Sequence, residues 1–161
     1  MKYIYIGKLV NTHALKGEVR IISNFDYKDR VFKSGFVLYL GPYKNPEVIE
    51  TYRTHKQYDM VKFKGIDYIN DVLKYKGNAV YVNEEDIVLD DDEILESELV
   101  GVEVYNDEVL VGTISEYRSD NGNRMIRVND KLIPYNEDFI TKVSRSERKI
   151  YMSNIGVFLW E

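Results

Sequence analysis

Short stretches of alternating apolar and polar residues recur along the chain. Those in residues 1–83 are rich in β-branched and aromatic side chains, which favour strands with one buried face. The pairs Gly41-Pro42 and Asn45-Pro46 predict a turn between two of these stretches, because proline donates no hydrogen bond to a strand partner. The strands predicted in this half are residues 2–10, 18–23, 36–40, 48–54, 59–63 and 78–82.

One stretch of this half changes period. Apolar residues at spacings of three and four between Ile66 and Lys76 predict a helix with one inward face. Asp67 is expected to cap its N-terminus and Gly77 to end it. Residues 24–34 are polar with a few apolar anchors and predict an irregular or briefly helical excursion. Several closely spaced strands with one late helix are typical of a small closed barrel.

The second half of the chain again predicts strands. The turn residues 106–107, 119–122 and 129–130 separate its apolar stretches, and the last pair predicts a tight hairpin. Asn136 is expected to cap a short helical turn, and the apolar tail at 155–160 is expected to dock on the sheet. The strands predicted here are residues 99–105, 109–117, 125–128, 132–133 and 149–152.

Charge divides the chain into three parts. Residues 1–83 hold 14 Lys and Arg against 8 Asp and Glu, a net charge of +6. Residues 84–98 hold nine acids and no base, and residues 99–161 hold 8 bases against 10 acids. Like charges at this density keep a segment solvated. We therefore predict a mainly β protein of two small β-barrel domains, 1–83 and 99–161, joined by an acidic linker at 84–98, with short helices.

The composition excludes several kinds of chemistry. The chain has no Cys and only two His, His13 and His55, so thiol catalysis is absent and a zinc site of Cys and His is not expected. The acids at 90–92 lack the alternating ligands and central glycine of a calcium loop. No glycine-rich nucleotide-binding motif occurs. We therefore expect no catalytic residue, no cofactor and no bound metal.

Nothing in the pattern predicts export or membrane insertion. Lys8 interrupts the N-terminal apolar run, and no apolar stretch reaches the length of a membrane span. The absence of Cys is compatible with a reducing compartment. We therefore expect a cytoplasmic protein without a membrane partner.

Binding is better supported than catalysis in the first half. This half carries the basic excess and ten of the fourteen tyrosines. Lys and Arg attract phosphate and unpaired bases stack on aromatic rings, so RNA is the favoured partner. Residues 11–17 connect the first two predicted strands, and their polar tip is either a binding site or an ordinary solvated loop. The candidate partner-binding residues here are Asn11, Thr12, His13, Lys16 and Arg20.

The stretch Gly7–Val19, which reads Gly-Lys-Leu-Val-Asn-Thr-His-Ala-Leu-Lys-Gly-Glu-Val, resembles the N-terminal signature of the ribosome maturation factor RimM family. The family's motif has Gly where this chain has Ala14, and Ala would be strained there if the backbone has positive φ. The order of elements resembles the family's N-terminal barrel throughout. The second half resembles the PRC-barrel domain, chiefly at 99–104, 111–114 and 132–135.

The resemblance implies a non-catalytic assembly factor for the head of the small (30S) ribosomal subunit. It implies the small subunit, 16S rRNA and a basic head protein, small-subunit ribosomal protein nineteen, as partners, the last contacted through the second barrel. Many family members place two aromatic residues just before that barrel, where this chain has Ile94 and Leu95. These two are further candidate partner-binding residues, or else they fix the linker to a barrel. The first possibility predicts that replacing both by Asp weakens subunit association without unfolding.

Two other classes of function stay open on the sequence. An RNA-modifying or small-molecule-binding twin-barrel enzyme would need a pocket lined by His13, His55 or paired carboxylates with shifted pKa values. A generic adaptor would join two proteins and would not bind ribosomal RNA in a salt-sensitive manner.

Overall fold

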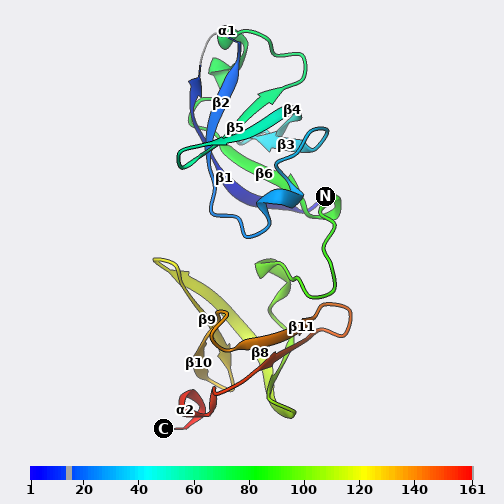
Figure 1. Cartoon of the computed structure of the whole chain (residues 1–161), viewed down its shortest axis with the longest axis vertical. Helices are drawn as coiled ribbons and strands as arrows, with labels where there is room; N and C mark the ends of the chain where they lie inside the picture. The colour runs from blue at the N-terminus through cyan, green and yellow to red at the C-terminus, as the bar shows by residue number, and fades with distance from the viewer. Residues whose placement is uncertain (14–15, 161) are drawn as a thin grey trace. The chain divides into compact units, whose positions relative to one another are not determined.

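The computed structural model describes residues 1–13 and 16–160, and the chain divides into two compact units, Met1–Val88 and Leu89–Glu161. Strands dominate both units, and each helix is only three or four residues long (Figure 1). The prediction of a mainly β protein with two strand-built units is confirmed. The short helices are η1 (Lys28–Arg30), α1 (Ile69–Val72), η2 (Leu73–Tyr75), η3 (Glu84–Asp86), η4 (Glu96–Glu98) and α2 (Gly156–Leu159).

Six strands close the first unit into a barrel, with neighbours in the order β1-β2-β5-β4-β3-β6. Alternate residues of these strands point inward, and Leu9, Ile21, Val61 and Phe63 are fully buried there. The residues between them, such as Arg20, point outward and supply the barrel's polar surface. The strands are β1 (Tyr3–His13), β2 (Glu18–Ile22), β3 (Val37–Leu40), β4 (Asn45–His55), β5 (Tyr58–Phe63) and β6 (Ala79–Asn83).

The helix predicted between β5 and β6 is shorter and tighter than expected. A single α-helical turn, α1, passes directly into the 3₁₀ turn η2, and Tyr68 rather than Asp67 precedes it without a side-chain cap. Asp67 instead pairs with Lys62 at 3.0 Å. Because a 3₁₀ turn repeats every three residues, Val72 and Tyr75 both point inward. Gly77 ends the segment at positive φ, as predicted.

The predicted turn around the two prolines is only partly correct. Residues 41–44 form the turn, but Pro46 lies inside β4, opposite Tyr39 of β3. At this point β4 pairs with β3 on one side, because its pairing with β5 begins only at Ile49. A proline is tolerated where its missing N–H would have no strand partner.

The sheet of the second unit also has six strands, in the order β10-β9-β8-β7-β12-β11. β10 and β11 end this sheet, whereas the first sheet closes on itself. β12 and β7 pair in parallel. Asn129 and Asp130 both have positive φ, which matches the predicted tight hairpin between β9 and β10. The strands are β7 (Glu103–Asn106), β8 (Val109–Asp120), β9 (Asn123–Val128), β10 (Lys131–Pro134), β11 (Ile140–Ser144) and β12 (Lys149–Met152).

The last part of the chain contains one strand, β11, that was not predicted. The short turn before it is as expected: the Asn136 Oδ1 atom accepts a hydrogen bond from the Asp138 amide at 2.9 Å, and the Asn136 carbonyl oxygen accepts one from the Ile140 amide at 3.0 Å. The apolar tail docks as expected. Ile155 is fully buried, and the Phe158 ring packs edge-on against Phe139 with 5.4 Å between centroids.

Candidate nucleic-acid interface

The β1–β2 hairpin carries the first group of predicted binding residues. β1 extends to His13 and β2 begins at Glu18, so Asn11, Thr12 and His13 lie in a strand rather than in the predicted connection. The Asn11 Oδ1 atom accepts a hydrogen bond from the Thr12 amide at 2.8 Å. Strand pairing places Asn11 opposite Arg20 and His13 opposite Glu18. The hairpin therefore brings predicted binding residues from both strands together.

The turn between β1 and β2 depends on one glycine, Gly17. Gly17 has a φ of +87°, and a Cβ atom there would lie 2.9 Å from the carbonyl oxygen of Ile66, so a larger residue would be strained and crowded. Lys16, immediately before it, is exposed. The expected strain at Ala14 falls outside the described residues.

Arg20 and His13 form the centre of a cluster on the outer surface of the barrel. The Arg20 Nη2 atom donates a hydrogen bond to His13 Nδ1 at 2.8 Å. Because a guanidinium only donates, Nδ1 accepts, and the neutral ring then carries its proton on Nε2. That Nε2 atom lies 4.0 Å from Glu18 Oε1. The Arg20 guanidinium also lies 5.5 Å from the centroid of the Tyr58 ring, which holds it against β5.

Glu18 connects this pair to β4. The Arg53 Nε and Nη2 atoms donate to the two Glu18 carboxylate oxygens at 2.9 and 2.7 Å, a bidentate ion pair. These hydrogen bonds lower the pKa of Glu18 more than burial raises it, so the carboxylate stays ionised. The centroid of the His55 ring lies 6.0 Å from that of His13. We call His13, Glu18, Arg20, Arg53 and His55 the cationic cluster.

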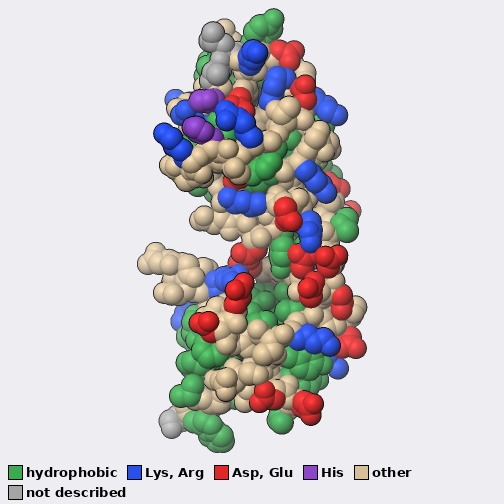
Figure 2. Space-filling model, viewed as in Figure 1, with side chains coloured by type: hydrophobic (Ala, Val, Ile, Leu, Met, Phe, Trp, Pro, Cys, Tyr) green, Lys and Arg blue, Asp and Glu red, His purple; other side chains and the backbone are tan. Residues whose placement is uncertain are grey.

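The residues of the cationic cluster come from β1, β2 and β4, which together with β5 are four neighbouring strands of the barrel. The cluster has two arginines and one carboxylate, so its net charge is positive. The exposed Lys16 and Lys56 lie in the turns that join β1 to β2 and β4 to β5. Figure 2 shows the two histidines side by side in purple, with blue Lys and Arg side chains around them. Such groups donate hydrogen bonds and offer positive charge, which are the requirements for holding phosphate oxygens.

Sequence reasoning found part of this cluster. It singled out His13 and Arg20 for binding, and the structure brings them into contact. It did not single out Glu18, Arg53 or His55 for that role. Arg53 lies in the predicted strand 48–54 and His55 directly after it; because β4 extends to His55, alternation places both on one face. Only the pairing of β2 with β5 and of β5 with β4 brings that face to His13, and such pairing is not written in local sequence.

The acidic segment, residues 84–98, is shared between the two units. Ile87 is buried in the first unit, and the segment belongs to the second unit from Leu89 onward. Ile94 and Leu95 expose only 6% and 2% of their surface, and Ile94 packs in the core of the second unit. This burial fits the second possibility that the sequence left open, in which they fix the segment to a barrel. We now expect their replacement by Asp to unfold the second unit.

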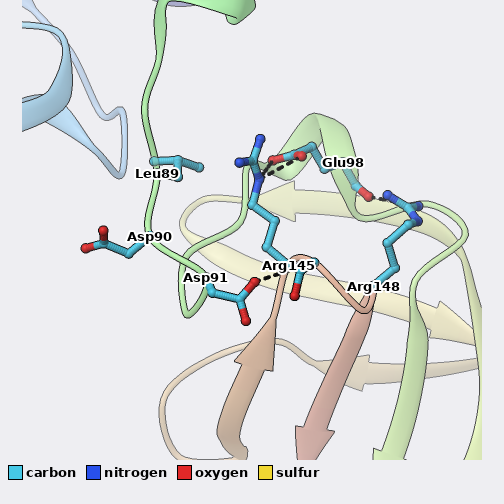
Figure 3. A pocket seen from close by; sticks show the side chains of 7 residues that line it. Leu89, Asp90, Asp91, Glu98, Arg145 and Arg148 are labelled. Carbon is cyan, nitrogen blue, oxygen red and sulfur yellow. Dashed lines mark hydrogen bonds and ion pairs between the residues drawn. The ribbon is translucent and has the colours of Figure 1, made fainter.

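Hydrogen bonds fix the rest of the segment to the turn between β11 and β12 (Figure 3). Asp91 accepts bonds from the Ser146 amide at 2.7 Å and from the Ser144 hydroxyl at 3.2 Å, and these bonds lower the pKa of Asp91. Glu98 accepts bonds from Arg145 Nε at 3.1 and 3.0 Å. The pocket that they border has a volume of about 470 Å³ and is lined by Leu89, Asp90, Asp91, Glu98, Arg145, Ser146 and Arg148.

This pocket does not meet the requirements of the enzyme alternative. It includes neither His13 nor His55, and its charged walls are largely paired with each other. Beside it, one carboxylate oxygen each of Asp90, Asp92 and Glu93 lies within 4.8 Å of the others. Exposed acids commonly gather without a metal, and these carry no further feature of a metal site. Within residues 1–13 and 16–160, no helix is long and apolar enough to cross a membrane.

Comparisons with known proteins point to one family. Residues 4–87 match the family model of the RimM N-terminal domain. The chain is 36% identical to a ribosome maturation factor RimM from an Exiguobacterium species, over 96% of this chain and 95% of the relative. It is 39% identical to a ribosome maturation factor RimM from Streptococcus mutans, over 89% of each chain. A solved structure of a 16S ribosomal RNA processing protein RimM from Pseudomonas aeruginosa covers 98% of this chain and is itself covered completely, with a TM-score of 0.49 and 18% identity.

These findings define a two-unit β protein whose first unit is a RimM-type barrel with a cationic cluster on its outer surface. The likeness to the relatives extends through the second unit to nearly the whole chain. The chain belongs to the ribosome maturation factor RimM family.

Proposed function

We propose that this protein is a cytoplasmic, non-enzymatic maturation factor of the small ribosomal subunit. In this role it binds the immature head of the subunit through 16S rRNA and small-subunit ribosomal protein nineteen. Membership of the RimM family supports the ribosomal role. The composition of the cationic cluster supports binding over catalysis, since guanidinium and imidazole groups are gathered there without a Ser, Cys or Lys nucleophile among the five residues.

The observation that carries the RNA part of the proposal is the placement of the cationic cluster. Arg20 and Arg53 lie on adjacent parts of one outer surface, with Asn11 beside them in β1 and Lys16 in the turn of the hairpin, whereas Thr12 lies opposite the inward-facing Val19. The arginines donate to phosphate oxygens, and the Asn11 amide adds neutral hydrogen bonds. Phosphate binding through such groups fixes a protein on RNA with little dependence on base sequence.

The second unit is the part that we assign to the ribosomal protein. The acidic segment is fastened to it by Asp91 and Glu98, and its remaining carboxylates stay at the surface. Negative charge at that surface attracts a basic partner and discourages contact with RNA. Ile94 and Leu95 contribute indirectly, because their burial holds this charged segment in one position.

The proposed mechanism uses binding energy alone. A protein that binds the immature head more tightly than the mature head stabilises the immature conformation while the next assembly step occurs. It is released as the head matures, because the mature conformation binds it less well. No reacting group is required.

Co-sedimentation tests this proposal. We expect the protein to sediment with free small subunits but not with assembled ribosomes. Arg20→Gln, which removes a cation from the cluster, should weaken that association about tenfold, and raised salt should weaken it further. Arg118→Gln, which removes an exposed cation from the second unit, is the matched control. Equal binding to free subunits and assembled ribosomes, or turnover of a small molecule, would overturn the proposal.

A further inference from the structure

A second surface of the first barrel is built from tyrosine rings. Tyr5 of β1 pairs with Tyr81 of β6, and Tyr81 pairs with Tyr39 of β3, so three rings form a row across three neighbouring strands. Tyr3 lies two residues before Tyr5 on the same side of β1, 5.1 Å from Tyr39 between ring centroids. The Tyr5 and Tyr81 centroids are 5.9 Å apart. We call these four tyrosines and Lys44, whose Nζ lies 4.2 Å from the Tyr81 centroid, the tyrosine face.

The tyrosine face is exposed to solvent along β1. Tyr5 exposes 59% of its surface and Tyr3 37%. The aliphatic residues of these strands point the other way: Ile6, Val80 and Leu38 are buried in the barrel. The exposed rings therefore do not serve the core, and a cluster of exposed aromatic side chains marks a contact surface.

The charges around the face favour a polyanion. Lys44 lies over two of the rings, and Lys8 is exposed further along β1. Two acids follow the end of β6: Glu84 forms an ion pair with Lys2 at 3.1 Å, and Asp86 lies close enough to Tyr39 to influence its hydroxyl. Burial, with a smaller contribution from Asp86, raises the pKa of Tyr39, so its hydroxyl keeps its proton and can donate.

We infer that the tyrosine face is a stacking platform for unpaired bases of RNA, with Lys44 beside it to hold a phosphate. The inference rests on the proposed function and adds to it a second contact, which reads single-stranded RNA rather than phosphate charge alone. Exposed rings stack on any base, because every base has a π-face. Tyr5 and Tyr3 present the most accessible rings, so they are the expected stacking partners.

A protein partner fits this surface less well. Protein-binding patches are enriched in aromatic residues, Met and Arg and depleted in Lys. Here the strands contribute tyrosines and lysine to the outside while their aliphatic side chains fill the core. Tyrosine rings interleaved with cations are the combination expected of a single-stranded RNA surface.

Fluorescence anisotropy with the full chain tests the inference. The probes are a labelled 12-nucleotide oligoadenylate and a labelled RNA duplex of similar charge. Tyr5→Ala should weaken binding of the single strand about tenfold and leave duplex binding unchanged, whereas Tyr5→Phe, which keeps the ring, should bind like the unchanged protein. Tyr151→Ala is the matched control, because that ring is already stacked on Tyr105 in the second unit.

Ultraviolet cross-linking to a 4-thiouridine oligonucleotide provides a second measurement that does not depend on a variant's folding. Cross-links should map to the peptides that contain Tyr3, Tyr5, Tyr39 or Tyr81. The inference is overturned if the unchanged protein does not bind the single strand, or if Tyr5→Ala binds it normally. It is also overturned if Tyr5→Ala impairs only subunit co-sedimentation, which would indicate a protein contact. The proposed function fails separately, when the unchanged protein does not sediment with free small subunits.

Discussion

Glu18 illustrates how one side chain sets the charge of a surface. It lies among two arginines and two histidines, and its bidentate pair with Arg53 holds that guanidinium across the β2–β5–β4 region. Without Glu18, Arg20 and Arg53 would repel each other. The acid thus permits two cations to share a small area, while their excess charge stays available to a phosphate.

The ion pair makes a pH-dependent contribution to stability. Arg53 lowers the pKa of Glu18 in the folded protein. The stabilisation by the ion pair is therefore fully present above pH 4.5, the ordinary pKa of a glutamate, and is lost as the pH falls through the lower pKa that Glu18 has in the folded protein. Glu18→Gln should therefore be less stable than the unchanged protein near pH 6, by at most about 1 kcal/mol for a pair this exposed. The difference should shrink towards pH 3.

Urea unfolding at several pH values measures this effect. Arg53→Met should remove the same pH dependence, and combining it with Glu18→Gln should change nothing further, because the two residues form one pair. A stability difference that stays constant between pH 6 and pH 3 would contradict the assignment.

At the scale of elements, the acidic segment behaves as part of the second unit rather than as a free tether. Its Asp91 carboxylate caps the β11–β12 turn through Ser146 and Ser144, and its backbone carbonyl accepts the Arg145 amide at 2.8 Å. A segment with many like charges would otherwise remain solvated. These bonds explain how it keeps one course over the turn.

Asp91→Ala should loosen this turn. The Ser146 amide would lose its acceptor, and hydrogen exchange at that amide should become faster by about tenfold while the amides in the centre of the sheet remain protected. Exchange measured by mass spectrometry or NMR reports the change. Asp92→Ala, which removes a neighbouring exposed acid, should leave Ser146 protected. Equal acceleration in both variants would indicate a general charge effect rather than the loss of a specific bond.

Most strands were predictable from sequence, whereas their partners were not. Alternation and turn residues located eleven of the twelve described strands within a few positions, because turns such as the Asn129-Asp130 hairpin are encoded locally; β11 was missed. The helix after Ile66 was overestimated, since spacings of three and four do not distinguish an α-helix from one α-turn followed by a 3₁₀ turn. The contact of His13 with Arg20 could be anticipated from sequence, but Arg53 joins them only through the pairing of β2 with β5 and of β5 with β4.

At the scale of the whole molecule, charge and packing divide the chain at different places. The charge pattern predicts a linker over residues 84–98, yet the packing boundary falls between Val88 and Leu89. Apolar residues inside the acidic run account for the difference: Ile87 is buried and belongs to the first unit, and Ile94 packs in the core of the second. The composition of a segment therefore indicates its exposure on average and not the places where it is anchored.

Fragments with different boundaries test which division governs folding. The fragment 89–161 should unfold cooperatively, because it keeps every described side chain of its core. The fragment 99–161 lacks Ile94 and Leu95, and each buried side chain of this kind contributes about 1.5–3 kcal/mol. A domain this small has a stability near the lower end of about 5–15 kcal/mol, so the loss should leave it largely unfolded at 25 °C. Circular dichroism during urea unfolding distinguishes the two fragments. Equal midpoints would mean that the anchors contribute little and that residues 84–98 act as the linker that their charge predicts.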